Sequence, residues 1–336
     1  MNHTCWQVVR IAAAAALLLA AAGLRGEQAR AQEPPLVRVV QVACPGVMTD
    51  TGPQADKVLA MVRRGLLETT GQDTIAEAWG RFVRPEDIVG LKIDTRSAPQ
   101  LATHREVVEA LAQTLQEAGI PAENIVVWDG QQADLGRAGW TLADEPGQLR
   151  VLASDVEGYD EVAYFDCEPA SAEGERRSRF SKILTKRITK LVNVPVLAYQ
   201  PGAGVSMALE NLVFGCCDNT SRGQVNQAAE FLTIGFAQPA VQKRLTLVIA
   251  DALRPRYDGS PGGEAAGEWN CDSLIFALGQ PSADAVGVAI IDEKRREKGL
   301  APLAETEDRP DFLTEIAGRG LGITDLAKIK WDKVTL

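Results

Sequence analysis

Histidine is scarce in this sequence, and its scarcity limits the available chemistry. Two histidines occur in 336 residues, and one of them, His3, lies at the N-terminus. If the N-terminal segment is removed in the mature protein, His104 is the histidine that remains. A zinc site built on two or three histidines is then excluded, and a histidine-dependent catalytic triad would have to use His104.

The cysteines lack the spacing of redox and iron–sulfur motifs. Beyond the N-terminal segment, the cysteines are Cys44, Cys167, Cys216, Cys217 and Cys271. We expect most of them to be buried as small apolar residues. Neighbouring Cys216 and Cys217 are poorly placed for a bridge, so Cys44 with Cys167 or Cys271 is the better candidate for a disulfide. Thiol chemistry at Cys216 and Cys217 is an alternative without a recognised redox spacing.

Long apolar runs are missing except near the N-terminus. Arg10 precedes an apolar run from Ile11 to Leu24, which is shorter than the about 18 residues needed to span a bilayer. Ala29-Arg30-Ala31 then supplies a small-x-small cleavage pattern. We therefore expect a secretory signal peptide at residues 1–31 and one exported α/β domain at residues 32–336, located in the periplasm or secreted. Signals for a lipid anchor or twin-arginine export are lacking.

A basic excess is also missing. The formal net charge of −10 becomes −12 when residues 1–31 are removed, because that segment holds three arginines and one glutamate. An acidic domain is poorly suited to nucleic acid or to an anionic membrane, so we expect neither as a partner. A small-molecule or anionic ligand remains open, and the oligomeric state is not indicated.

An alternation of strands and helices is the clearest pattern present. Ile88 to Ile93 predicts a strand, Thr103 to Gly119 a helix, and Ile125 to Trp128 another strand. Thr103 and Glu106 have the spacing of a capping box at the helix start. Strand, helix and strand in this order form a parallel crossover. We expect an α/β fold with a mostly parallel central sheet and flanking helices, which could divide into two lobes around a cleft.

The stretch from Lys190 to Arg222 is the main candidate for a site. It predicts a strand at Leu191 to Leu197, a glycine-containing loop, and a helix over Val205 to Phe214. Glycines allow close approach of a ligand, and amides at a helix start favour anions. The ligand-binding candidates in this stretch are Gly202, Gly204, Ser206, Glu210 and Asn211. A dinucleotide site is disfavoured because Met207 replaces the third glycine of the motif.

Three aspartates follow predicted strands. Asp94 and Asp129 follow the strands of the crossover, and Asp251 follows a predicted strand at Leu245 to Ala250. Ligands in open parallel sheets bind beyond the carboxyl ends of strands, so these side chains are candidates to line a crevice. The alternative is that they cap loops and helices, as aspartates after strands often do.

A divalent-cation site is a second hypothesis. Glu210, Asp218 and Asn219, together with Asn211 and either Asp94 or Asp251, offer the oxygen ligands that calcium and magnesium prefer. The spaced aspartates of a calcium-binding loop are missing, however, and carboxylates scattered over an acidic surface explain the same residues. A divalent cation is the one cofactor that the sequence suggests.

Several segments in consistent order resemble the "domain of unknown function 362" family. They are Val89 to Asp94, Glu123 to Gly130, Leu191 to Gly215, Ile249 to Leu253 and Gly320 to Gly322. The resemblance extends over roughly residues 36–334 and implies an α/β fold and, in many members, export. It does not imply a settled activity. Some members carry appended iron–sulfur modules whose Cys-x-x-Cys spacing this chain lacks.

The chain departs from the family pattern at three polar positions. The family typically has lysine, histidine and lysine where this chain has Ala198, Gln200 and Glu210. The local charge changes by about −3, and each charge near a bound anion is worth about 1 to 4 kcal/mol. We therefore expect a degenerate site that keeps the fold and has a small-ligand binding or scaffold role. The alternative is an enzyme with a cation-assisted site at the strand ends; the sequence names no reaction.

Overall fold

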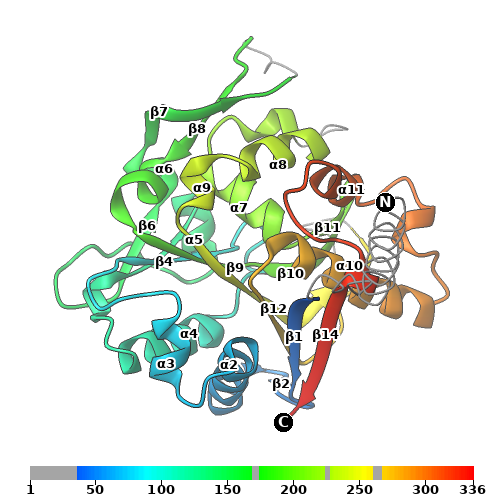
Figure 1. The fold of residues 1–336 in the computed structure, drawn as a ribbon, viewed down its shortest axis with the longest axis horizontal. Coiled ribbons are helices and arrows are strands. Elements are labelled where there is room, and N and C mark those ends of the chain that lie inside the picture. Colours follow the sequence, from blue (N-terminus) through cyan, green and yellow to red (C-terminus); the bar gives the residue numbers. More distant parts are fainter. Residues whose placement is uncertain (1–35, 169–173, 224–227, 260–266) are drawn as a thin grey trace, which may run out of the picture. The chain divides into compact units, whose positions relative to one another are not determined.

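A mostly parallel sheet forms the centre of the structure, which is a computed structural model describing residues 36–168, 174–223, 228–259 and 267–336 (Figure 1). Its main path runs in the order β14 (Ile329–Thr335), β1 (Val37–Ala43), β13 (Ser273–Ala277), β12 (Leu245–Arg256), β9 (Lys190–Val194), β4 (Val89–Ile93), β5 (Ile125–Asp129) and β6 (Arg150–Ala153). A branch adds β10 (Val196–Gln200) beside β12, and β11 (Gly204–Ser206) beside β10. Within this sheet β13 is antiparallel to both neighbours, and β11 is antiparallel to β10.

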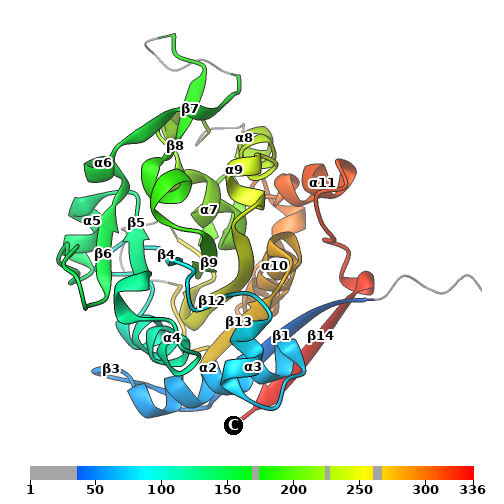
Figure 2. The same ribbon diagram turned by 60° about the vertical axis from the view of Figure 1, so that its left-hand side comes forward.

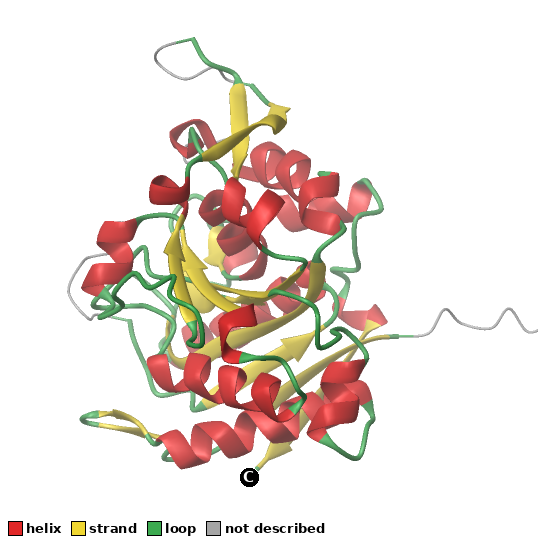
Figure 3. Ribbon diagram, turned by 90° about the vertical axis from the view of Figure 1, so that its left-hand side faces the viewer, coloured by secondary structure: helices red, strands yellow, loops and turns green. Residues whose placement is uncertain are grey.

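Helices cover both faces of the sheet (Figure 3). One apolar core cluster includes residues of α2 (Ala55–Thr70), α3 (Ile75–Gly80), α4 (Arg105–Glu117) and α5 (Gln132–Arg137). The other includes residues of α7 (Ala208–Cys216), α8 (Ala228–Phe236), α10 (Gln280–Glu297) and α11 (Asp311–Gly318). Two short helices, α6 (Ser154–Glu157) and α9 (Pro239–Gln242), and the hairpins β2 (Met48–Thr49) with β3 (Gly52–Pro53) and β7 (Tyr159–Asp166) with β8 (Arg177–Ser181) complete the fold. Figure 2 shows β7 and β8 extending beyond the helices. The predicted α/β class is confirmed.

Alternating side chains join each strand to both layers. In β12, Leu247 and Ile249 belong to the core cluster of α2, whereas Val248 and Ala250 belong to that of α7. A strand that is buried on both faces therefore needs a continuous apolar run. In β4 the same alternation places Leu91 toward α2 and the polar Lys92 toward α7, where it meets Asn211.

The start of α4 differs from the prediction. Its N-cap is His104, which makes no side-chain capping bond, so the predicted Thr103 and Glu106 capping box is wrong. Thr103 instead donates through Oγ1 to the Val194 carbonyl at 2.8 Å and accepts from the Asp94 amide at 2.9 Å. Thr103 is 3% exposed, and its hydroxyl forms hydrogen bonds with the buried ends of the strands. A capping box does occur at α3, between Thr74 and Glu77.

The predicted strand over Leu191 to Leu197 is two strands. β9 ends at Val194 and β10 begins at Val196 because Pro195 has no amide with which to continue the ladder. After the glycine loop, β11 precedes the helix, so α7 begins at Ala208 and not at Val205.

The strand β12 is longer than predicted. It continues from Leu245 to Arg256, so Asp251 lies inside the strand and not after it. The pairing with β10, in which Val196 lies opposite Asp251 and Ala198 opposite Arg256, extends the strand. That pairing joins segments more than fifty residues apart, which a local pattern does not reveal.

Among the described residues, no disulfide joins any two of the five cysteines. Burial was expected for most of them, and Cys44, Cys167, Cys216 and Cys217 are buried. The suggested pair of Cys44 with Cys167 or Cys271 is wrong. Cys44 belongs to the core cluster of α2, whereas the other two pack in the cluster of α7. The sheet lies between these clusters and keeps the sulfur atoms apart.

Residues Val37–Leu336 form one compact unit. The predicted signal peptide at residues 1–31 lies outside the described residues. No helix in the described ranges is both long and apolar enough to cross a bilayer.

Candidate functional site

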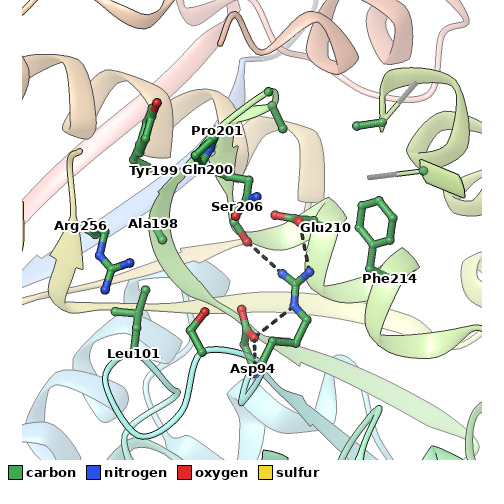
Figure 4. A pocket seen from close by; sticks show the side chains of 16 residues that line it. Asp94, Leu101, Ala198, Tyr199, Gln200, Pro201, Ser206, Glu210, Phe214 and Arg256 are labelled. Carbon is green, nitrogen blue, oxygen red and sulfur yellow. Dashed lines mark hydrogen bonds and ion pairs between the residues drawn. The ribbon is translucent and has the colours of Figure 1, made fainter. Parts of the chain in front are cut away.

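A polar cavity of about 420 Å³ lies beyond the ends of β4 and β10 (Figure 4). The candidates Asp94, Gly202, Ser206 and Glu210 line it, as do the three positions that depart from the family pattern, Ala198, Gln200 and Glu210. Other lining residues are Arg96, Ser97, Leu101, Tyr199, Pro201, Ala203, Phe214, Gly223, Ala228 and Arg256. The strand ends and the glycine loop therefore do meet at one cavity.

Arg96 connects the polar side chains of this cavity. Its guanidinium lies 3.1 Å from Glu210 Oε1, donates to Ser206 Oγ at 3.1 Å, and lies 3.6 Å from Asp94 Oδ1; Figure 4 draws these contacts as dashed lines. Burial opposes the charged form of Arg96, but Glu210 and Asp94 outweigh burial and raise its pKa. The side chain therefore remains charged and fixes both carboxylates.

Glu210 has one carboxylate oxygen without a partner in the described residues. Its side chain is 7% exposed, and Oε1 is paired with Arg96, but Oε2 is buried and accepts no hydrogen bond there. A buried acceptor that is left unsatisfied costs about 1 to 3 kcal/mol. A ligand that donates a hydrogen bond to Oε2 would remove this cost.

Asp94 is a carboxyl with weakened acidity. Burial raises its pKa, and the nearby negative charges of Asp129 and Glu210 add to this effect, whereas Arg96 and Lys92 act in the opposite direction. The net shift is upward, so Asp94 holds its proton at a higher pH than an exposed aspartate does.

Arg256 brings a second cation to the cavity. It is 1% exposed, forms an ion pair with Glu268 at 3.1 Å, and lies opposite Ala198 in the pairing of β10 with β12. The lining thus holds two arginines and two carboxyl groups. The cationic side chains come from outside the Lys190 to Arg222 stretch, and the sequence reasoning missed both of them.

Asp129 and Asn211 hold a buried lysine and do not line this cavity. Lys92 Nζ lies 2.6 Å from Asp129 Oδ1 and donates to Asn211 Oδ1 at 2.7 Å. Burial acts to raise the pKa of Asp129, but Lys92 and the donors of Thr95 and Gly130 lower it overall. The missed signal was a lysine in the middle of a predicted apolar strand.

Asp251 lies at a different place and binds His104. The His104 Nδ1 is 2.7 Å from Asp251 Oδ2, and the His104 amide donates to the same oxygen at 2.8 Å. Burial acts to raise the pKa of Asp251, but His104 and backbone donors lower it. The three aspartates therefore do not converge: Asp94 lines the polar cavity, Asp129 binds Lys92, and Asp251 binds His104.

Carboxylates of the chain itself occupy the backbone donors that favoured an anion. The Gly202 amide donates to Asp308 Oδ1 at 2.6 Å, and the first amides of α7, Ala208 and Leu209, donate to Asp284 at 2.6 and 3.0 Å. Burial raises the pKa of Asp284 to about 7 in spite of these donors. Gly204, at φ 75°, lies where an added Cβ would strike the Asp308 carbonyl, so it permits packing within the chain.

The weak metal candidates do not assemble. Asp218 accepts from the Arg179 amide at 2.6 Å and pairs with its guanidinium at 2.7 Å, while Asn219 donates to the Arg177 carbonyl at 2.9 Å. Both contacts are with β8, whereas Glu210 lines the polar cavity. Across the part of the chain that is described, no group of three His, Cys, Asp or Glu side chains is arranged to hold a metal ion.

The fold and this cavity define the class: an α/β protein with a polar cavity at the ends of its parallel strands. The family model described as "Domain of unknown function (DUF362)" matches residues 89–289, and the chain belongs to this family. A crystal structure of a Thermotoga maritima protein, a target of the Northeast Structural Genomics Consortium, is similar with a TM-score of 0.40 and 11% identity. The similarity covers 73% of this chain and 59% of that chain. No curated protein matches the sequence.

Proposed function

We propose that this protein binds a small polar molecule in the 420 Å³ cavity and that the ligand donates hydrogen bonds, as an amine or a polyol does. The unpartnered Oε2 of Glu210 in the cavity wall is the observation that carries the proposal. The volume lies within the range of small-molecule sites, about 300 to 1,000 Å³. Both lining arginines already have carboxylate partners, so the cavity offers little to a free anion.

The expected departures from the family pattern support a binding role. Glu210, where the family resemblance implies a lysine, is neutralised by Arg96. Ala198, where it implies another lysine, has Arg256 beside it on the neighbouring strand. The positive charge at this cavity therefore comes from Arg96 and Arg256, and both side chains form ion pairs within the chain. Export to the periplasm or beyond, inferred from the N-terminal pattern, is part of the same proposal.

Isothermal titration calorimetry with separate panels of polyols, amines and dicarboxylates tests the proposal. We expect saturable binding of an amine or a polyol. Glu210→Gln should lower the affinity by about tenfold or more, because an amide replaces one of the two acceptor oxygens of the carboxylate by an NH2 donor. Glu315→Gln is the matched control, since Glu315 of α11 pairs with Arg319 just after that helix, and the residues of α11 are not among those lining the cavity. Binding of dicarboxylates alone, or equal affinity in both variants, contradicts the proposal.

A further inference from the structure

A second cavity, of about 280 Å³, lies at the start of α4 and is lined by positive side chains. Its lining consists of Pro99, Gln100, Leu101, Ala102, Thr103, His104, Arg105, Arg137, Ala138 and Arg254. Three arginines and a histidine thus meet at one cavity, and none of the residues that line it is acidic. We propose that this cavity is a binding site for phosphate, either free or as the head group of a small phosphomonoester.

Arg254 is the strongest reason for this assignment. Its side chain donates to two neutral groups, Asn270 Oδ1 at 3.1 Å and the Thr49 carbonyl at 3.2 Å. Within the described ranges it makes no ion pair with a carboxylate. No carboxylate of the described residues therefore neutralises its charge, and a guanidinium is suited to bidentate binding of a phosphate.

The other two arginines are held in place by the protein. Arg105 lies over the ring of Trp140, with its guanidinium carbon 4.0 Å from the ring centroid, and donates to the Gly139 carbonyl at 2.5 Å. Arg137 donates to the Ala98 carbonyl at 3.1 Å and pairs with Asp134. Side chains that are already ordered lose less conformational entropy when a ligand binds.

His104 adds a fourth donor when its ring is protonated, because Nε2 then carries a hydrogen. Asp251 holds the Nδ1 atom, which leaves Nε2 as the ring nitrogen available to a ligand. His104 is also the N-cap of α4, a helix of 13 residues, and its side chain makes no capping bond. The partial positive charge of the helix start therefore acts in the same direction as the arginines.

This cationic cavity is unusual in a chain with a formal net charge of −10. It has Leu101 in common with the polar cavity, but its charged groups are different. The inference therefore does not depend on the proposed binding of a donor ligand near Glu210. A failure of one proposal leaves the other standing.

Calorimetric titration of the purified protein with inorganic phosphate, glycerol 3-phosphate and malonate, at constant ionic strength, tests the inference. We expect one saturable site for phosphate or for the phosphomonoester. The substitutions Arg254→Gln and Arg105→Gln should each weaken it by about tenfold or more. Arg319→Gln is the matched control, because Arg319 is exposed and its partner Glu315 lies on α11, the helix that Arg319 follows. Glu210→Gln should leave phosphate binding unchanged.

Two further measurements keep the test decisive. Thermal unfolding without phosphate shows whether each variant is folded. Arg254→Lys keeps the positive charge but lacks the paired N–H donors of a guanidinium, so it should lose part of the affinity for phosphate. Tighter binding of glycerol 3-phosphate than of phosphate identifies an ester ligand, and the reverse order identifies the free ion. The proposal is overturned by a lack of saturable phosphate binding, by malonate binding as tightly as phosphate, or by an equal loss in Arg319→Gln.

Discussion

Lys92 has no exposed surface, and its ammonium group nevertheless has all its hydrogen bonds. Its three donors reach the Ile93 carbonyl, Asp129 Oδ1 and Asn211 Oδ1 at 2.6 to 2.7 Å. A buried charge without such partners costs several kcal/mol. Asp129 and Asn211, which the sequence offers as ligand-binding candidates, are therefore required to keep β4 and α7 together.

Individual site residues could be predicted where they follow the end of a strand. Asp94 lines the polar cavity because it follows the carboxyl end of a parallel strand, and Ser206 and Glu210 line it because they follow the glycine loop after β10. Arg256 could not be predicted, because it reaches the cavity only through the pairing of β12 with β10. The partners of Lys92 lie 37 and 119 residues away, so a sequence pattern does not reveal them.

The pair of His104 and Asp251 should make stability depend on pH. Burial lowers the pKa of His104, but Asp251 outweighs burial, with a smaller contribution from Glu106 on α4 and opposition from Arg254 on β12, so the pKa is raised. A raised folded-state pKa stabilises the protein below the unfolded value of about 6.5 and loses this effect as the pH rises through the folded value. The lowered pKa of Asp251 confines the effect to pH values above about 4.

Urea unfolding of the wild type and of His104→Asn measures this effect. We expect the wild type to be more stable by about 1 to 2 kcal/mol at about pH 5.5, and the difference to shrink toward about pH 9. An equal difference at both values would show that the ion pair contributes nothing beyond packing.

At the scale of elements, α7 approaches β4 closely because Gly215 has no side chain. A Cβ at Gly215 would collide with Lys92 Nζ and lie 2.5 Å from Lys92 Cε. We expect Gly215→Ala to lower the free energy of unfolding by about 2 kcal/mol or more, because the lysine cannot move without losing its partners. Chemical denaturation measures this loss.

Gly136→Ala is the control for the same measurement. Gly136 lies in α5, and an added Cβ would meet nothing within 4 Å. Alanine should therefore stabilise that helix by up to about 1 kcal/mol. Similar effects of the two substitutions would contradict the packing of α7 described above.

The existence of most elements could be predicted, whereas their boundaries could not. The apolar runs of β4 and β5 and the stripe of α4 are local signals that survive in the structure. Thr103 does not cap α4 because a buried carbonyl of another strand takes its hydroxyl. Tertiary contacts of this kind override local capping preferences.

At the scale of the whole molecule, the sheet depends on its last strand. β14 pairs in parallel with β1 along seven residues, from Val37 opposite Ile329 to Ala43 opposite Thr335. Removal of residues 329–336 would leave β1 as an unpaired edge. We expect a lower midpoint of chemical unfolding and concentration-dependent association, measured by denaturation and size-exclusion chromatography.

Lys330→Ala is the control for this truncation, since it changes an exposed side chain of β14 and keeps the backbone pairing. It should leave both measurements close to those of the wild type. A truncated protein that unfolds at the wild-type midpoint and stays monodisperse would show that β14 is dispensable.

Asp308 and Asp284 belong to the same chain as the amides that they contact, and this has a consequence for competition. A group that is tethered in place acts at an effective concentration of millimolar or higher. A free anion must exceed that concentration, or bind much more tightly, before it displaces Asp308 from Gly202 or Asp284 from the start of α7. The amides of the glycine loop and of the start of α7 are thus already bound by carboxylates of the same chain, and an external anion at low concentration will not displace them.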